Sequence, residues 1–254
     1  MPGQFDLRPA PLGAGVVAGF STRTGGASAP PFDTLDLAAN VGADPDLVRA
    51  NRSAFAALVD AGSAVLCWAE QVHGAEVAVV VDAADAASRS GERGIASVDA
   101  LVTAARGVLL CIRVADCLPV LFADPAAGVV GAAHAGRRGL AAGVLLNTVT
   151  AMESLGASRK NLHAVLGPSI CGRCYEVPAL LQAQFEAVVP GAAAMTRSGT
   201  PSLDLPAAAR SLLERLDVAA IDSVDECTFE RPDRWFSYRR SARTGRFAGY
   251  VGLS

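Results

Sequence analysis

The chain has 254 residues, of which 51% are hydrophobic and 19% are charged, and its formal net charge at pH 7 is -3. A chain of this length and apolar content can bury a full core, which excludes a largely disordered protein. No uninterrupted apolar run approaches the roughly 20 residues that cross a bilayer, so we expect no membrane association. The slightly acidic balance gives no sign of a nucleic-acid surface, and we expect no nucleic-acid partner.

The first residues, MPGQFD, lack a basic segment followed by an apolar one, and we therefore expect a cytoplasmic protein. In a reducing compartment the six cysteines would remain thiols or bind metal. The chain shows no internal repeat and no stretch that resembles a linker. We therefore predict one domain over residues 1–254.

The first predicted element is a helix over residues 44–59, which opens with Asp and Pro and carries apolar residues on one face. Short apolar runs bounded by Gly, Pro and Asp follow. Such runs are typical of strands buried on both faces, and we expect them in a central sheet. They cover residues 64–68, 77–81, 100–103, 108–114, 119–123 and 129–133.

A long helix is predicted over residues 137–155, followed by a strand at 162–166, which gives a strand, helix, strand unit. Two further helices are predicted at 178–188 and 205–216, the second with Asp204 as its N-cap. Strands near 220–228 and 246–253 complete the pattern. The fold class is α/β or α+β, with a mixed sheet and helices on its faces.

Three histidines occur in the whole chain, which makes their surroundings informative. His73 lies in EQVHG between two strand-like runs, where a loop can present the imidazole at a sheet end or simply cap a turn. His134 lies in AAHAGRRG at the junction of a strand and a helix. His163 lies inside an apolar strand, which favours a packed histidine or one at a sheet edge over a functional one.

Cys117 lies in ADCLP, a turn at the end of an apolar strand. Two imidazoles and a thiolate are good Zn²⁺ ligands, and three protein ligands with a fourth position for water describe a catalytic site. The spacing of His73, Cys117 and His134 is long, however, and matches no short zinc motif. Spacing alone therefore leaves a Cys-His catalytic pair and plain core packing open.

Arginines accompany these residues in glycine-rich segments. Arg138 follows the turn at Gly136 that opens the predicted helix, Arg23 lies in FSTRTGG, and Arg239 and Arg240 form a pair near the C-terminus. Guanidinium groups suit phosphate or carboxylate, so these residues indicate an anion site beside a metal. The alternative is an ordinary solvated surface.

Cys171 and Cys174 form a C-x-x-C motif, which is a redox pair in some proteins and half of a zinc site in others. No second C-x-x-C occurs, and Tyr175, Glu176 and Pro178 follow the motif in the middle of the chain. The sequence favours a loop with buried thiols.

Ordered motifs extend over nearly the whole chain: FSTRTGG at 20–26, NVGADP at 40–45, EQVHG at 70–74, ADCLPVLFADP at 115–125, AAHAGRRGLAAGVL at 132–145, LGPSI at 166–170 and FSYRR at 236–240. Together they resemble the bacterial YfiH/YlmD group, also called laccase-domain or polyphenol-oxidase-like proteins. The resemblance implies a layered α/β/β/α fold with mixed sheets, shared with toxin-type cysteine hydrolases. It also implies a zinc site, with copper as an alternative metal, whose ligands are His73, Cys117 and His134.

The resemblance further implies a purine nucleoside phosphorylase that acts on adenosine, inosine and 5′-methylthioadenosine, with adenosine deaminase activity. Its substrates would be purine nucleosides and phosphate. We expect Arg23 and Arg138 to contribute to catalysis, and Asp116 to act either as an acid/base group or by orienting a ligating imidazole.

Three positions depart from the family pattern. Arg137 stands where Trp is usual, Ala43 where Asp is usual, and Asn40 where His is frequent. We expect Arg137 to alter substrate preference if the usual Trp stacks on the base, and the changes at 40 and 43 to weaken substrate contacts. The three predicted metal ligands are all present.

Two other functions remain as hypotheses. In a metal-free hydrolase Cys117 would be the nucleophile and His134 its base, whereas a partner-binding protein would turn over no nucleoside. A multicopper oxidase does not fit, because a blue-copper site already takes two histidines and a cysteine. One histidine would then remain for every other copper.

Overall fold

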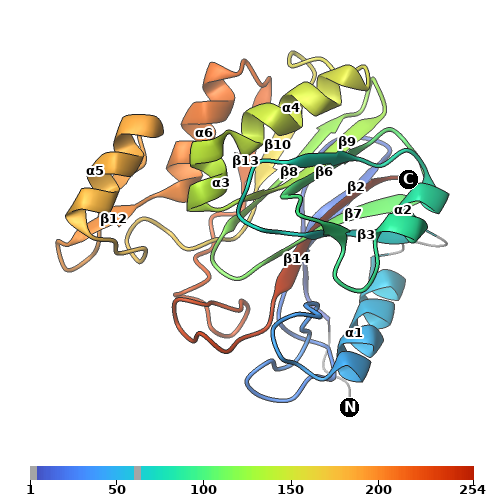
Figure 1. The fold of residues 1–254 in the computed structure, drawn as a ribbon, viewed down its shortest axis with the longest axis horizontal. Coiled ribbons are helices and arrows are strands. Elements are labelled where there is room, and N and C mark those ends of the chain that lie inside the picture. Colours follow the sequence, from blue (N-terminus) through green and yellow to red (C-terminus); the bar gives the residue numbers. More distant parts are fainter. Residues whose placement is uncertain (1–4, 60–63) are drawn as a thin grey trace.

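The computed structural model describes residues 5–59 and 64–254. Two six-stranded mixed sheets pack face to face, and helices cover their outer sides (Figure 1). This α/β/β/α arrangement confirms the expected fold class. None of the helices within these two ranges is long and apolar enough to cross a membrane.

The first sheet is covered on its outer face by α1 (Pro45–Leu58), where Phe55 packs edge-on against Tyr250 with ring centroids 5.4 Å apart. The short helix α2 (Ala83–Arg89) contacts β3. The strands of this sheet, in spatial order, are β1 (Leu7–Pro9), β2 (Val16–Ser21), β14 (Phe247–Leu253), β7 (Val108–Val114), β3 (Val65–Glu70) and β5 (Ile95–Ala96).

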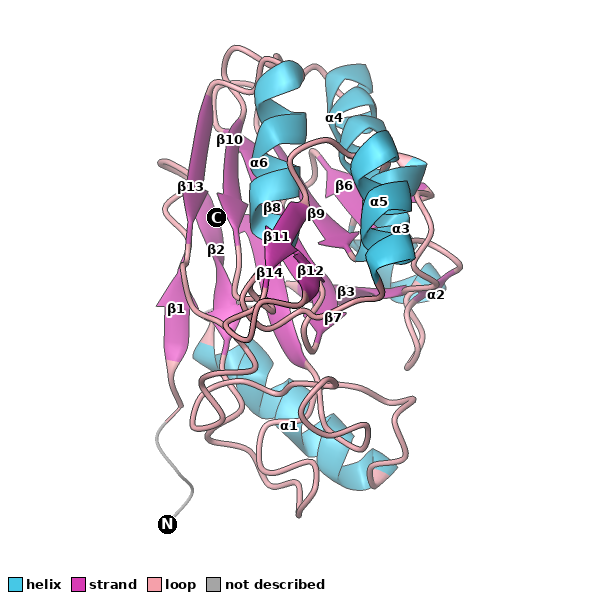
Figure 2. Ribbon diagram, turned by 90° about the vertical axis from the view of Figure 1, so that its left-hand side faces the viewer, coloured by secondary structure: helices cyan, strands magenta, loops and turns pink. Residues whose placement is uncertain are grey.

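The second sheet carries α3 (Arg137–Ala142), α4 (Val144–Ser154) and α6 (Leu205–Arg215) on its outer face (Figure 2). The helix α5 (Ala179–Val188) lies to one side and packs against the hairpin of β11 and β12, residues 193–195 and 201–203 (Figure 1). Its strands, in spatial order, are β13 (Ala220–Ser223), β10 (His163–Leu166), β8 (Leu118–Asp124), β9 (Val129–Ala135), β6 (Ala100–Thr103) and β4 (Val77–Val79). A separate hairpin joins β11 (Ala193–Met195) and β12 (Pro201–Leu203).

The alternation of residues along β8 explains why the apolar runs are continuous. Val120 and Phe122 pack toward the helices, whereas Leu121 and Ala123 pack between the two sheets. Both faces are therefore buried, as the sequence predicted. The prediction of one central sheet was wrong, because an apolar run shows that both faces are covered and not whether a helix or a second sheet covers them.

Several boundaries also differ from the prediction. The helix expected over 137–155 is broken at Gly143, whose φ of 90° lies in the left-handed region, so α3 and α4 are separate helices. The strand expected over 220–228 ends at Ser223, and the following segment crosses to the C-x-x-C loop. The sequence analysis did not predict the short elements β1, β2, β5, α2, β11 and β12.

Candidate active site

Three elements bring the predicted metal ligands together. His73 lies in the loop after β3, Cys117 in the turn between β7 and β8, and His134 within β9. Their donor atoms all lie within 4.8 Å of one another, and Nε2 of His73 is 3.7 Å from Sγ of Cys117. The two imidazole rings meet edge to face, with centroids 4.7 Å apart. His73, Cys117 and His134 are separated by 44 and 17 positions in the sequence, yet they form one cluster.

A buried carboxylate, Asp99, organises two of these ligands. Its Oδ1 lies 2.7 Å from Nδ1 of His134, and its two oxygens accept backbone N–H groups of Val72, His73 and Gly74 at 2.7 to 3.1 Å. Asp99 therefore fixes the ring of His134 with Nε2 toward Cys117, and it also holds the loop that presents His73.

The electrostatics of the cluster favour a thiolate. Burial alone would raise the pKa of Cys117, but the charge of His134 and hydrogen bonds from His134 and His73 lower it to about 6. Burial would lower the pKa of His134, but Cys117 and Asp99 raise it to about 9. Burial likewise opposes ionisation of Asp99, yet the bond from His134 and the backbone N–H groups lower its pKa. Without metal, these shifts favour a thiolate on Cys117 beside an imidazolium on His134.

The donor set and its surroundings fit a metal ion. Gly136 lies where the three donors converge: a Cβ there would be 3.0 Å from Sγ of Cys117, 3.1 Å from Cδ2 of His73 and 3.6 Å from Nε2 of His134. The φ of Gly136 is -72°, so its backbone does not require glycine. We infer that the space beside the donors explains the missing side chain.

The cluster opens into a cavity of about 830 Å³. Its walls carry five arginines, an unusual concentration in a chain of net charge -3. They are Arg113, Arg137, Arg138, Arg239 and Arg246.

Arg113 is the most deeply buried of these arginines, with 6% of its surface exposed. Burial lowers its pKa to about 10, which keeps it cationic at neutral pH. Its Nη2 donates to the carbonyls of Ala69 and Arg93, while its buried Nη1 has no hydrogen-bond partner among the described residues. Because this nitrogen has almost no accessible surface, Arg113 contributes positive charge to the cavity wall and not a free donor.

Asp116 lies in the cavity wall next to Cys117, with a φ of 93°. Its carboxylate accepts the hydroxyl of Thr228 and the backbone N–H of Arg239, both at 2.6 Å. The left-handed backbone and these two bonds fix its side chain at the turn that crosses between the sheets. Within the described ranges, Asp116 makes no hydrogen bond to either imidazole. The orienting role that we had considered for Asp116 belongs to Asp99.

The two predicted catalytic arginines have different positions. Arg138 is exposed and lines the cavity, as expected. Arg23 lies outside the cavity wall, because Nη2 pairs with Asp33 at 3.0 Å, Nε donates to the Asp33 carbonyl and Nη1 donates to the Pro232 carbonyl. The expectation that Arg23 reaches the site is not met, and its contacts give it a structural role.

Of the positions that depart from the family pattern, Asn40 and Arg137 line the cavity, and Arg137 contacts the hydroxyl of Tyr175. Ala43 is not part of the described cavity wall. His163 begins β10, is half-buried and also lies outside the wall. The aromatic rings of Tyr175 and the exposed Tyr238 provide flat apolar surface in the same cavity.

Sequence reasoning missed Asp99, Arg113 and Arg246. The signal for Arg113 was a lone arginine inside the otherwise apolar run 108–114, and for Asp99 an aspartate directly before the apolar run 100–103. A charge in a buried strand is costly without a partner or a function. Arg246 lies at the edge of the predicted last strand, where arginine is common on the surface.

The chain is similar to known proteins over most of its length. The sequence profile of the family described as "Multi-copper polyphenol oxidoreductase laccase" matches residues 17–254. A protein named purine nucleoside phosphorylase from Streptomyces coelicolor is 50% identical over 235 residues, which cover 92% of this chain and 94% of that protein.

Two solved structures have the same fold. YlmD from Geobacillus stearothermophilus superposes with a TM-score of 0.87 and 31% identity, covering 99% of this chain and 98% of that one. YfiH from Bacillus licheniformis superposes with a TM-score of 0.85 and 30% identity, covering 94% and 93%. The chain therefore belongs to the laccase-like polyphenol oxidoreductase family, together with YfiH and YlmD.

Proposed function

We propose that this protein is a zinc-dependent purine nucleoside phosphorylase that acts on adenosine, inosine and 5′-methylthioadenosine, with deamination of adenosine as a second activity. The observation that carries the proposal is one cavity that combines a three-donor metal site with five arginines. The name of the Streptomyces coelicolor relative supports the phosphorylase class.

His73, Cys117 and His134 would hold Zn²⁺, because two imidazoles and one thiolate suit this ion and leave a fourth position open. When bound there, the ion supplies Lewis acidity for the attacking phosphate or water. Copper accepts the same ligands and is the alternative metal. The family description names several coppers, but this chain has three histidines, and two of them already belong to this cluster.

The arginines give the chain a means of holding phosphate. In phosphorolysis a phosphate oxygen bonds to C1′ of the ribose while the bond from C1′ to N9 breaks, and the purine leaves with a proton. Arg138 is exposed in the wall and is placed to donate to phosphate oxygens, whereas the buried Arg113 adds positive charge beside them. Holding phosphate against the ribose supplies proximity and charge stabilisation.

Tyr175 and Tyr238 would pack against the purine, with Arg137 beside Tyr175 in place of the usual tryptophan. Asp116 is the carboxylate fixed in the cavity wall, and we assign it the proton transfer to the leaving purine. In deamination water would attack C6 of adenosine, ammonia would leave, and the same carboxylate would carry the proton.

A metal-free hydrolase is the second candidate, because the contact between Cys117 and His134 favours a thiolate and imidazolium pair. The third donor, His73, has no part in that mechanism. Loss of activity on chelation and its return with zinc would support the metal enzyme. Trapping of an acyl adduct on Cys117 would support the hydrolase.

The proposal is tested by incubating purified protein with adenosine, with and without phosphate, and identifying the products by chromatography. We expect adenine and ribose 1-phosphate only in the presence of phosphate, and some inosine under both conditions. Turnover of inosine and 5′-methylthioadenosine is tested in the same way. If no nucleoside is converted by metal-loaded protein, the proposed function is wrong, and a role in partner binding becomes the better account.

A further inference from the structure

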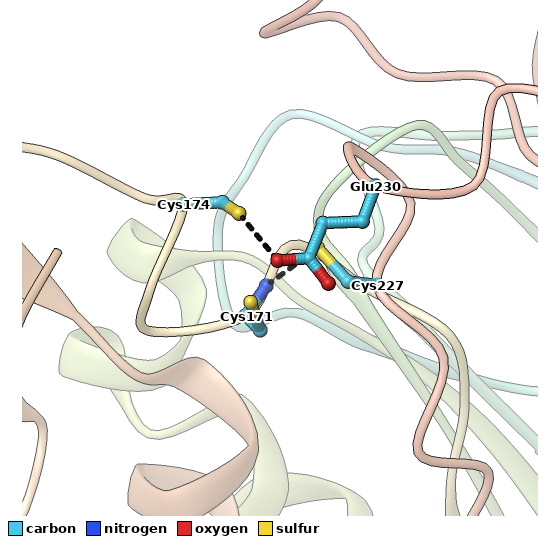
Figure 3. A group of neighbouring side chains, drawn as sticks. All are labelled: Cys171, Cys174, Cys227 and Glu230. Atoms are coloured by element: carbon cyan, nitrogen blue, oxygen red, sulfur yellow. Dashed lines mark hydrogen bonds between the residues drawn. The ribbon is translucent and has the colours of Figure 1, made fainter. Parts of the chain in front are cut away.

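Three cysteines and a glutamate form a second cluster, separate from His73, Cys117 and His134. Cys171 and Cys174 come from the loop after β10, and Cys227 and Glu230 come from the segment after β13 (Figure 3). The three Sγ atoms and a carboxylate oxygen all lie within 4.8 Å of one another. The sequence analysis expected buried thiols in this loop, but Cys171 and Cys174 are only half-buried, whereas Cys227 is buried.

The backbone of both segments directs the thiols to one point. The N–H groups of Cys174 and Tyr175 donate to the Cys171 carbonyl at 2.9 and 3.0 Å, which closes the C-x-x-C turn. A parallel bridge between Ser169 and Cys227 joins the two segments. The N–H of Cys171 also points at Sγ of Cys227, 3.4 Å away, as Figure 3 shows. The convergence thus follows from main-chain bonds.

This donor set matches a closed metal site. Zn–S bonds of about 2.3 Å in a tetrahedron place neighbouring sulfurs about 3.8 Å apart, so the cluster needs only a small contraction to surround zinc. Sγ of Cys174 is already 3.3 Å from Oε1 of Glu230. Four protein ligands leave no position for substrate, which is the arrangement of a structural site.

The charges nearby are suited to such a site. Three thiolates and a carboxylate around Zn²⁺ leave a net charge of about -2. Two arginines lie beside the carboxylate: Nη2 of Arg197 is 2.6 Å from Oε1 of Glu230, and Nη2 of Arg173 is 3.8 Å from Oε2. Both arginines would offset the negative charge and orient Glu230. A disulfide would use two of the three thiols and leave the third thiol and the carboxylate without a role.

The cluster stands directly behind the wall of the active-site cavity. Ile170 and Tyr175, on either side of the C-x-x-C motif, line that cavity. Thr228, next to Cys227, donates the hydrogen bond that holds Asp116. A metal ion held by both segments would therefore fix the cavity wall and the position of Asp116.

We propose that Cys171, Cys174, Cys227 and Glu230 form a structural zinc site that ties the loop of residues 167–178 to the segment of residues 226–231. This site is distinct from the catalytic metal site, and the proposal does not depend on the reaction that the protein catalyses.

The test is the zinc content of full-length protein purified without added metal. We expect two zinc ions per chain in the wild type. Cys67→Ala is the control and should also hold two, because Cys67 is buried between the sheets and belongs to neither cluster. We expect one ion in Cys117→Ala, one in Cys227→Ser and none in the double variant. Loading Cys117→Ala with Co²⁺ alone should give the intense sulfur-to-cobalt absorption of several thiolate ligands.

A second measurement does not require the Cys227→Ser variant to fold. In Cys117→Ala, removal of zinc should make amide hydrogen exchange in residues 168–178 faster by on the order of tenfold. The proposal is overturned if Cys117→Ala retains no zinc and binds no Co²⁺ through thiolates. It is also overturned if unreduced protein is lighter by two hydrogens, which would show a disulfide among these cysteines.

Discussion

Asp99 and His134 form a buried pair in which the carboxylate Oδ1 lies 2.7 Å from Nδ1 of the imidazole. Asp99 lies directly before β6, whereas His134 lies in β9. The backbone N–H of His134 also donates to the Asp99 carbonyl at 2.7 Å. The pair fixes the ring so that Nε2 is available to a metal ion. Since Asp99 holds the His73 loop as well, one carboxylate positions two of the three proposed metal ligands.

Asp99→Asn should weaken zinc binding at the proposed site of His73, Cys117 and His134. The amide loses the negative charge that supports His134, and its NH₂ group cannot accept the backbone N–H groups. Loss of such a supporting partner lowers metal affinity by roughly 10- to 100-fold. The measurement is a competition titration with a chromophoric chelator.

The matched control for this variant is Asp124→Asn. Asp124 is also buried and holds the backbone N–H groups of Ala127 and Ser158, but at the other end of β8. Its replacement should leave zinc affinity unchanged. Equal affinities in Asp99→Asn and the wild type would show that the carboxylate does not support the site.

Gly136→Ala should exclude metal while the fold is kept. The added methyl group would lie 3.0 Å from Sγ of Cys117, in the space where the donors converge, and the backbone conformation accepts alanine. We expect zinc content and activity to fall together, with a nearly unchanged melting temperature. Gly91→Ala is the control, because no atom lies within 4 Å of its Cβ position. Full zinc content in Gly136→Ala would contradict this placement of the ion.

Zinc binding should release about one proton between pH 7 and pH 8.5. In the metal-free site the pKa of Cys117 is lowered to about 6 and that of His134 is raised to about 9. The thiolate is therefore already formed in this window, whereas His134 must lose a proton to bind metal. Affinity should rise about tenfold per pH unit and level off above pH 9.

Calorimetric titrations in buffers of different ionisation enthalpy measure this proton count directly. A pH-independent affinity across the window would show that His134 is neutral in the metal-free protein. The titrations are best made on Cys227→Ser, so that the second cluster does not contribute.

Arg138→Gln should impair phosphate binding, whereas Arg23→Gln should impair stability. Arg138 is exposed in the cavity wall, so its loss should raise the KM for phosphate about tenfold or more and leave stability nearly unchanged. Arg23 is bonded to Asp33 and Pro232, so its loss should lower the free energy of unfolding by about 1–3 kcal/mol with an unchanged KM. Phosphate kinetics and denaturant unfolding on both variants separate these outcomes. A raised KM for phosphate in Arg23→Gln, with an unchanged KM in Arg138→Gln, would contradict this assignment and support a catalytic role for Arg23.

Much of the fold could be predicted from the sequence, because buried strands and amphipathic helices have periodic patterns. The strands β7, β8 and β9 and the helices α1, α5 and α6 were found with small boundary errors. The division into two sheets was not visible in the residues themselves, since the sheet that covers a strand is set by distant contacts. The break at Gly143 was missed because one glycine inside an apolar helix is compatible with either conformation.

The candidate metal ligands could be predicted from the sequence, but the residues that support them could not. The resemblance to known motifs identified His73, Cys117 and His134, which the structure brings together. Asp99 acts through backbone N–H groups, and no motif reveals which carboxylate will reach them. Cys227 was not linked to Cys171 and Cys174, because it lies 53 positions after the motif and only the pairing of the two segments brings them together.

The most direct test of the central claim is phosphate-dependent release of adenine from adenosine by wild type and Cys117→Ala, with zinc content measured on the same samples. We predict that the wild type forms adenine and ribose 1-phosphate. Cys117→Ala should retain only the zinc of the second cluster and form neither product. Full phosphorolysis by Cys117→Ala would contradict the account, because the cavity would then act without its metal site.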